Sequence, residues 1–124
     1  MRIPNKIRLN TTDQQLELGY ASGEEFALPA EFLRVLSPSA EVQGHGNPVL
    51  QTGKQFVRLT NVTAAGNYAL KLSFDDGHDT GLYTWDYLYQ LGSRQEELWQ
   101  NYLEQLRAAN QFRDPNQSAV KIML

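Results

Sequence analysis

Five consecutive residues, Asp75-Asp76-Gly77-His78-Asp79, place three carboxylates and an imidazole side by side in the chain. Imidazole and carboxylate ligands together suit zinc, iron or manganese, so one interpretation is a metal site. The other is a tight turn, because an Asp-Gly pair directly after an apolar strand is typical of a hairpin. The spacing departs from a calcium loop, which alternates its ligands and ends in a glutamate. From the residues alone we favour the turn.

The only other histidine in the chain lies between two glycines, which permit unusual backbone angles and the close approach of a ligand. If its loop meets the acidic turn, the two histidines could bind iron or another divalent metal together with carboxylates. The alternative is a surface loop that carries a histidine without a ligand. The candidate metal ligands are His45, His78, Asp76 and Asp79, with Asp75 and Glu41 as further carboxylates near them.

Catalytic motifs give no comparable signal. Serine, histidine and aspartate all occur, but there is no Gly-x-Ser-x-Gly turn and no recognisable placement of a nucleophile against a base. A phosphate-binding glycine–lysine loop and a dinucleotide fingerprint are also absent from the sequence. We therefore expect no catalytic residues and no bound organic cofactor. An enzyme with an unrecognised nucleophile is only the third hypothesis for function.

The composition excludes several classes of protein. A chain of 124 residues is expected to form one domain. Its net charge of -3 and its scattered basic residues argue against a nucleic-acid surface, which needs clustered Lys and Arg. The absence of cysteine excludes disulfides and thiolate metal sites. No signal peptide and no stretch of ~20 apolar residues occurs, so the sequence predicts a cytoplasmic protein with no membrane contact.

The hydrophobic pattern predicts an α+β fold, mainly antiparallel β-sheet with a short central helix and C-terminal helices. Apolar and polar residues alternate in the strands, whereas apolar residues recur every three or four positions in the helices. The predicted domain covers residues 1–110, and residues 111–124 are predicted to be a mobile tail. The predicted strands are 6–10, 16–20, 24–28, 55–62 and 67–74, the predicted helices are 29–36, 85–91 and 93–109, and a loop covers 37–54.

Local signals also set the predicted ends of the last two helices. Thr84 can cap the first of them, and Gly92 is expected to end it. Ser93 with Glu96 three residues later fits a capping box for the second.

Two longer segments carry a family resemblance. They are LPAEFLRVLSPSAEVQGHG, residues 28–46, and GNYALKLSFDDGHDTGLYTWDYLYQLG, residues 66–92. Both resemble the bacterial DUF971 family, whose domain is similar to the N-terminal domain of gamma-butyrobetaine hydroxylase and of trimethyllysine hydroxylase. The resemblance covers most of residues 5–92.

The resemblance implies where a metal site would lie and also that it has been lost. In those hydroxylases the domain resembles a zinc-binding module with three cysteines and a histidine. An alignment on Leu33-Arg34 places Ser37, Ser39 and Val42 at the cysteine positions, and His78 at the histidine. Three of the four ligands are therefore missing, so zinc is not expected in this mode, and the fold must obtain its stability from its core.

The resemblance does not imply oxygenase activity either. In those enzymes the iron chemistry belongs to a separate double-stranded β-helix domain, for which too few residues follow Gly92. The same domain resembles the last domain of plant P-loop ATPases that handle iron–sulfur clusters, which links the family to metal handling by analogy.

The leading hypothesis is therefore a non-catalytic accessory domain that works through protein contact, with a protein partner that handles metal or iron–sulfur clusters. Metal binding by the two histidines is the second hypothesis. The predicted interaction surface consists of Ser37, Ser39, Glu41, His45, Asp75 and His78.

Overall fold

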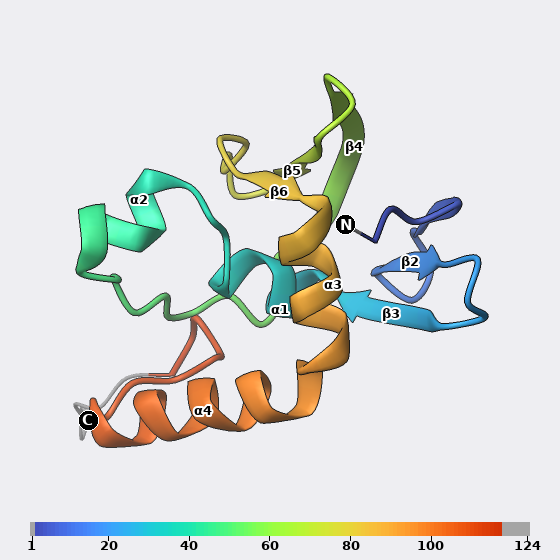
Figure 1. The fold of residues 1–124 in the computed structure, drawn as a ribbon. Coiled ribbons are helices and arrows are strands. Elements are labelled where there is room, and N and C mark those ends of the chain that lie inside the picture. Colours follow the sequence, from blue (N-terminus) through green and yellow to red (C-terminus); the bar gives the residue numbers. More distant parts are fainter. Residues whose placement is uncertain (1, 118–124) are drawn as a thin grey trace, which may run out of the picture.

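The computed structural model describes residues 2–117, which form two small antiparallel sheets and a set of helices (Figure 1). The first sheet has the order β1-β2-β3, in which each strand is antiparallel to the next. The second sheet has the order β4-β5-β6. The strands are β1 (Lys6–Asn10), β2 (Gln15–Gly19), β3 (Glu25–Pro29), β4 (Leu59–Ala65), β5 (Ala69–Phe74) and β6 (Leu82–Thr84).

Helices connect and cover the two sheets, which confirms the α+β class. A short helix follows the first sheet directly, and two longer helices follow the second. They are α1 (Ala30–Val35), α2 (Ala40–Gln43), the 3-10 turn η1 (Gly44–Gly46), α3 (Trp85–Ser93) and α4 (Gln95–Ala108).

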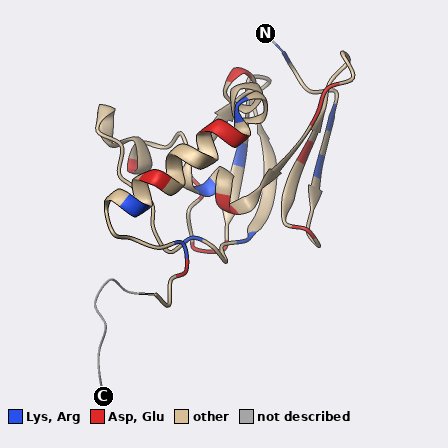
Figure 2. Cartoon of the chain, turned by 90° about the horizontal axis from the view of Figure 1, so that it is seen from below, with Lys and Arg blue, Asp and Glu red and all other residues tan. Residues whose placement is uncertain are grey.

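Of the helices within residues 2–117, none has the length and apolar character needed to cross a membrane. Figure 2 shows Lys and Arg positions spread over strands, helices and loops rather than gathered on one element.

The core lies between the inner faces of both sheets and the helices α1 and α3. On β5, Leu70, Leu72 and Phe74 are buried whereas Lys71 is exposed, as the alternation predicts. Leucines of β2 and β3, Phe32 and Leu33 of α1, and Leu88 and Leu91 of α3 also belong to this core.

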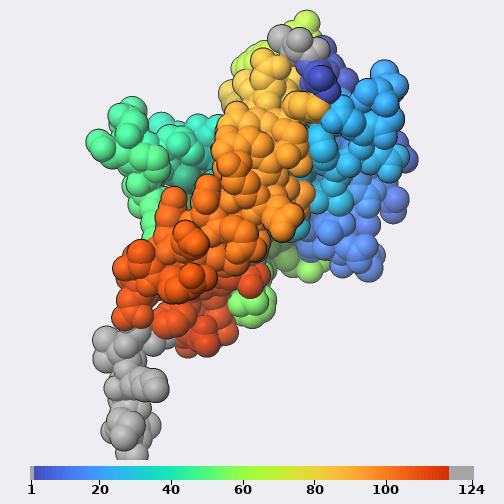
Figure 3. Space-filling view, turned by 60° about the horizontal axis from the view of Figure 1, so that its bottom comes forward, coloured from blue at the N-terminus to red at the C-terminus, as the bar shows by residue number. Residues whose placement is uncertain are grey.

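Two predicted segments differ from the structure. The strand predicted over 55–62 begins only at Leu59, because the backbone before it bonds elsewhere: Gln55 donates to the carbonyl of Arg113 and Arg58 donates to the Asp75 side chain. The loop predicted over 37–54 contains α2 and η1. We call residues 40–51 the lobe, because this segment projects to one side of the molecule (Figures 1 and 3).

The junction of the last two helices also corrects the prediction. Thr84 caps α3 as expected, since its Oγ1 accepts a hydrogen bond from the N–H of Tyr87 at 3.2 Å. Gly92, however, lies inside α3 and does not end it. The capping box is wrong, because Ser93 donates to the carbonyl of Gln90 and the residue before α4 is Arg94.

Gly92 is required by close packing rather than by a helix end. An added Cβ at this position would lie 2.2–2.6 Å from ring atoms of Phe26, so only a glycine lets α3 approach β3 this closely.

We expect Gly92→Ala to lower the free energy of unfolding by about 1–3 kcal/mol, because the added methyl group collides with the Phe26 ring. This sign is opposite to that of an ordinary Gly→Ala change within a helix, which stabilises. Urea denaturation measures the difference. Ser93→Ala, at an exposed neighbouring position, is the control and should change stability by less than about 0.5 kcal/mol. A Gly92→Ala protein as stable as the wild type would contradict this packing.

After α4 the chain returns to the segment around residues 53–55. The carbonyl of Phe112 accepts a hydrogen bond from Gly53 at 2.9 Å, and that of Arg113 accepts one from Gln55 at 3.0 Å. The predicted domain boundary at residue 110 and the mobile tail stay predictions. Residues 118–124, with the apolar end of the sequence, lie outside the described residues.

Candidate functional site

The acidic motif is a turn, as the residues indicate. β5 ends at Phe74, whose N–H donates to the carbonyl of His78 at 2.9 Å, and Gly77 donates back to the carbonyl of Phe74 at 3.1 Å. Gly77 has a φ of +87°, which a residue with a side chain rarely adopts. The turn therefore directs the His78 side chain back into the protein instead of toward solvent.

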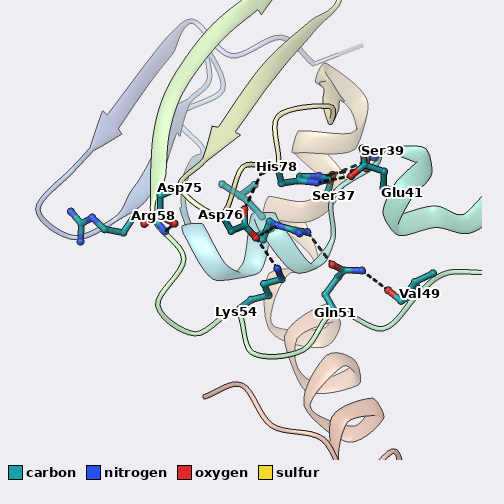
Figure 4. A network of polar contacts seen from close by, with 12 residues as sticks. Ser37, Ser39, Glu41, Val49, Gln51, Lys54, Arg58, Asp75, Asp76 and His78 are labelled. Carbon is teal, nitrogen blue, oxygen red and sulfur yellow. Dashed lines mark hydrogen bonds and ion pairs between the residues drawn. The ribbon is translucent and has the colours of Figure 1, made fainter. Parts of the chain in front are cut away.

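His78 joins this turn to the segment that follows α1 (Figure 4). Its buried ring has Nε2 2.8 Å from Ser37 Oγ and 3.4 Å from Ser39 Oγ. Its Nδ1 lies 3.4 Å from a carboxylate oxygen of Glu41. A hydrogen on Nδ1 satisfies Glu41 and leaves Nε2 free to accept from the Ser37 hydroxyl. Four residues of the predicted surface, from two distant segments, thus meet in one place, which we call the His78 cluster.

Burial keeps His78 neutral. Burial lowers the pKa of the His78 imidazole, and the nearby Arg34 guanidinium lowers it further. The carboxylates of Glu41 and Asp76 act in the opposite direction but do not outweigh these effects. A neutral ring is the form that the hydrogen bond from Ser37 requires.

This pKa predicts how stability depends on pH. An unfolded histidine titrates near pH 6.5, whereas folded His78 titrates lower, so the unfolded chain takes up the proton first. The free energy of unfolding should therefore fall as the pH drops from about 7 to about 5, by at most about 1.4 kcal/mol per pH unit for one group. Urea denaturation across this range measures the slope.

Matched variants assign this slope to one residue. His78→Gln should remove it, and His45→Gln, at an exposed position of η1, should keep it. If both variants keep the wild-type slope, His78 is not the group that titrates.

Asp76 is engaged by two cations. Its Oδ2 lies 2.9 Å from Arg34 Nε and 2.7 Å from Lys54 Nζ, and its Oδ1 accepts from the His78 N–H. The Asp76 backbone is exposed at the turn, but its side chain is 20% exposed, and the side chain of Arg34 only 8%. Burial raises the pKa of Asp76, yet the hydrogen bonds from Lys54, Arg34 and the backbone outweigh it and lower the pKa to about 2. Asp76 is therefore a structural anion that binds α1 and the 52–55 segment to the turn.

The remaining predicted residues are not among the bonded residues of the His78 cluster. Asp75 Oδ1 accepts from the N–H of Arg58 at 2.9 Å, which fixes the start of β4. Asp79 and His45 are exposed, and His45 lies in η1 with a φ of +53°. Within residues 2–117, no group of three or more His, Cys, Asp or Glu side chains is arranged to hold a metal ion. Metal binding through His45 and His78 stays a prediction without support from this geometry.

The His78 cluster resembles a hydrolase triad in one respect, which the sequence did not reveal. Ser37, His78 and Glu41 follow the order of nucleophile, base and orienting acid. However, Ser37 is fully buried, and a Cβ added at Gly81 would lie 2.6 Å from its Oγ. A substrate carbonyl has no room to reach this hydroxyl. The arrangement joins two segments of the chain, and its hydroxyl group is closed off from solvent.

The residues also do not fit the zinc site that the resemblance implies. Zinc prefers thiolate, imidazole and carboxylate ligands. Ser37 and Ser39 offer neutral hydroxyl groups next to His78, and the buried Val42 has no ligand atom. Hydrogen bonds between hydroxyl and imidazole thus lie where thiolates and a metal would lie.

Sequence reasoning missed the residues that surround this cluster. Tyr83 donates to the carbonyl of Leu33 at 2.6 Å, and Gln43 donates to the carbonyl of Ser37 at 2.8 Å. Arg34 also donates to Gln51 at 3.1 Å, which ties the end of the lobe to α1. Tyr83 and Leu33 are 50 residues apart and Arg34 and Gln51 are 17 apart, whereas the bond of Gln43 lies within one loop, and no motif of the sequence indicates any of the three.

The protein is thus a small α+β domain in which His78, at the turn after β5, contacts Glu41 of the projecting lobe. Residues 7–89 match the family model described as gamma-butyrobetaine hydroxylase-like, N-terminal. The chain belongs to this family, which confirms the resemblance of the two motifs.

Solved structures agree with this assignment. Two NMR solution structures are 60% and 51% identical to the chain, with TM-scores of 0.86 and 0.80. Each match covers 100% of this chain, and 99% and 95% of the other. A crystal structure of a DUF971-family protein of unknown function from Acidithiobacillus ferrooxidans is 37% identical, with a TM-score of 0.62 over 72% of this chain and 91% of that one. No protein with a curated description matches the sequence.

Proposed function

We propose that this domain is a non-catalytic accessory module that binds a partner protein through its lobe. One observation carries the proposal: the buried polar groups of the candidate site are bonded to one another. Ser37 is bonded to His78, and Arg34 is bonded to Asp76, so neither group is available for chemistry. These bonds fix Ser37 and Arg34, to which Gln43 and Gln51 of the lobe are bonded in turn.

The surface of the lobe suits a contact role. Val49 is 54% exposed although it is apolar, and the residues from His45 to Pro48 are exposed beside it. Its segment is held on both sides, by the bond of Gln43 to Ser37 and by that of Gln51 to Arg34. A rigid segment that presents an apolar side chain loses little conformational entropy when it binds.

A partner that handles metal or iron–sulfur clusters is the finer part of the proposal. It is supported by the resemblance to the iron–sulfur ATPases and by nothing in the side-chain geometry. This chain has no cysteine, so in such a complex the cysteine ligands of the cluster come from the partner.

Site-specific photo-cross-linking in the native cells tests the contact surface. A photoreactive residue at Val49 should give a discrete adduct, whereas the same residue at Ile7, exposed on β1 and 41% accessible, should not. His78→Ala in the Val49 probe should weaken the adduct, because the lobe loses its anchor. Adducts of equal strength at both positions, or none at Val49, would contradict the proposal. Mass spectrometry of the adduct then identifies the partner protein. Metal analysis of that protein shows whether it carries a metal or iron–sulfur cluster.

The metal-binding hypothesis has a separate test. Chelator-treated protein is titrated with Fe(II), Zn(II) and Mn(II) while the imidazole resonances of His45 and His78 are followed by NMR. If the domain is an interaction module, neither ring responds up to millimolar metal. A joint shift of both rings at micromolar metal would replace the proposal with metal binding.

A further inference from the structure

A cavity of about 620 Å³ lies beside the start of α1 and the junction of α3 and α4, away from the His78 cluster. Its walls combine apolar and charged groups. They include Pro29, Glu31, Phe32, Gly92, Trp99 and Arg113. The unusual member is Glu31, a carboxylate whose side chain is only 8% exposed. A carboxylate buried to this extent needs a cationic partner.

A guanidinium group meets this need in the structure. Arg113 forms a two-point contact with Glu31, from Nε to Oε2 at 2.9 Å and from Nη2 to Oε1 at 2.7 Å. The Arg113 Cζ also lies 5.1 Å from the centre of the Trp99 ring. The carboxylate fixes the plane of the guanidinium, and the indole stabilises its positive charge.

The two receiving side chains are held in place without Arg113. Trp99 packs edge-on against Phe32, with ring centres 6.3 Å apart, and lies 5.3 Å from the ring of Tyr102. Glu31 lies in the first turn of α1, directly after β3. Both belong to regular elements that the core fixes, so the receptor for the guanidinium is pre-formed.

Arg113, in contrast, comes from the segment after α4. Within the described residues this segment returns to the body through two backbone hydrogen bonds, to Gly53 and Gln55. Its side chain is 38% exposed and faces the open cavity. The cation of the pair is therefore its accessible and exchangeable member.

We propose that Glu31 and Trp99 form a binding site for a guanidinium group, which Arg113 occupies from within the chain and which an arginine side chain of a partner protein can take over. Arginine is the matching chemistry because its planar fork makes two parallel bonds to a carboxylate and stacks on an aromatic ring. Lysine offers a single point charge and does neither. The site lies apart from the lobe and does not depend on the function proposed for it.

The test uses the full chain and a small probe, N-acetyl-arginine methylamide, with N-acetyl-lysine methylamide as the matched control. Binding is followed by NMR on the indole N–H of Trp99, with Trp85, bonded to the carbonyl of Asn67, as the internal reference. Arg113→Ala empties the site, so the arginine probe should shift the Trp99 signal saturably and leave Trp85 unchanged. The wild type should bind at least about tenfold more weakly, because Arg113 competes from within the chain.

The double variant and the lysine probe decide the outcome. Adding Glu31→Gln to Arg113→Ala removes the carboxylate charge and should abolish the shift. Equal binding of the lysine probe, unchanged binding in the double variant, or no response in Arg113→Ala would each overturn the proposal. If Arg113→Ala does not fold, Arg113→Lys takes its place, since it keeps a positive charge near Glu31, and the same outcomes apply.

Discussion

Asp76→Ala is expected to lower the free energy of unfolding by about 3 kcal/mol, because it leaves the buried Arg34 guanidinium without its anion. The Arg34 side chain is 8% exposed, so water replaces the lost carboxylate only in part. The same substitution removes the partner of Lys54 and the acceptor for the His78 N–H. We place the loss at the lower end of the range for buried pairs, since the Asp76 side chain retains some contact with solvent.

Urea denaturation of matched variants measures this loss. Asp79→Ala, at an exposed position of the same turn, is the control and should stay within about 0.5 kcal/mol of the wild type. Combining Asp76→Ala with Arg34→Met should cost less than the sum of the two single changes, because the unpaired cation is then absent. Equal losses for Asp76→Ala and Asp79→Ala would show that the ion pair does not stabilise the fold.

The second large effect is a gain. Replacing Ser37, Ser39 and Val42 together by cysteine should create a zinc-dependent protein. Two of these positions already point at His78 Nε2, from 2.8 and 3.4 Å, and the family resemblance aligns all three with thiolate ligands. Structural zinc sites contribute on the order of 10 kcal/mol of apparent binding free energy near neutral pH. The triple variant should therefore melt at a higher temperature with zinc than with a chelator.

Melting curves with and without zinc check this, and two controls locate the metal. The wild type should show no zinc dependence, and adding His78→Asn to the triple variant should weaken the response. A folded triple variant that ignores zinc would mean that the three positions do not converge on His78.

The sequence predicts the parts of this fold that depend on local pattern. Alternation in β5 and the Asp-Gly pair after it define a strand and a turn, and the structure has both. β6 has only three residues, which is too short for any period to be visible. Gly92 illustrates a different limit: a glycine near the end of a helical pattern is typical of a helix end, and only the position of Phe26 shows that it serves packing.

The capping box at Ser93 fails for a geometric reason. Arg94 is the single residue between α3 and α4, and its backbone serves both helices: its N–H donates to Gln90 and its carbonyl accepts from Leu98. A continuous hydrogen-bond path leaves no open helix end for a side chain to cap.

In the candidate site, too, some contacts could be predicted from the sequence and others could not. The meeting of His78 with Ser37 follows from the family resemblance, which assigns both to one site, although they are 41 residues apart. The anchoring pair of Arg34 and Asp76 spans 42 residues and has no motif of its own. Such a charge pair can be recognised only in the three-dimensional structure, where α1 lies beside the turn.

These separations also order the events of synthesis. β1, β2 and β3 are neighbours in the sequence and can pair as soon as the ribosome has released them. Glu31, Arg34 and Ser37 emerge next, but Asp76 and His78 are translated about forty residues later and Arg113 is 82 residues beyond Glu31. Until then the nascent chain carries three polar groups that only its later parts can satisfy. We therefore expect the slow step in folding to be the closure of long loops around α1, with the lobe among the last segments to reach its final position.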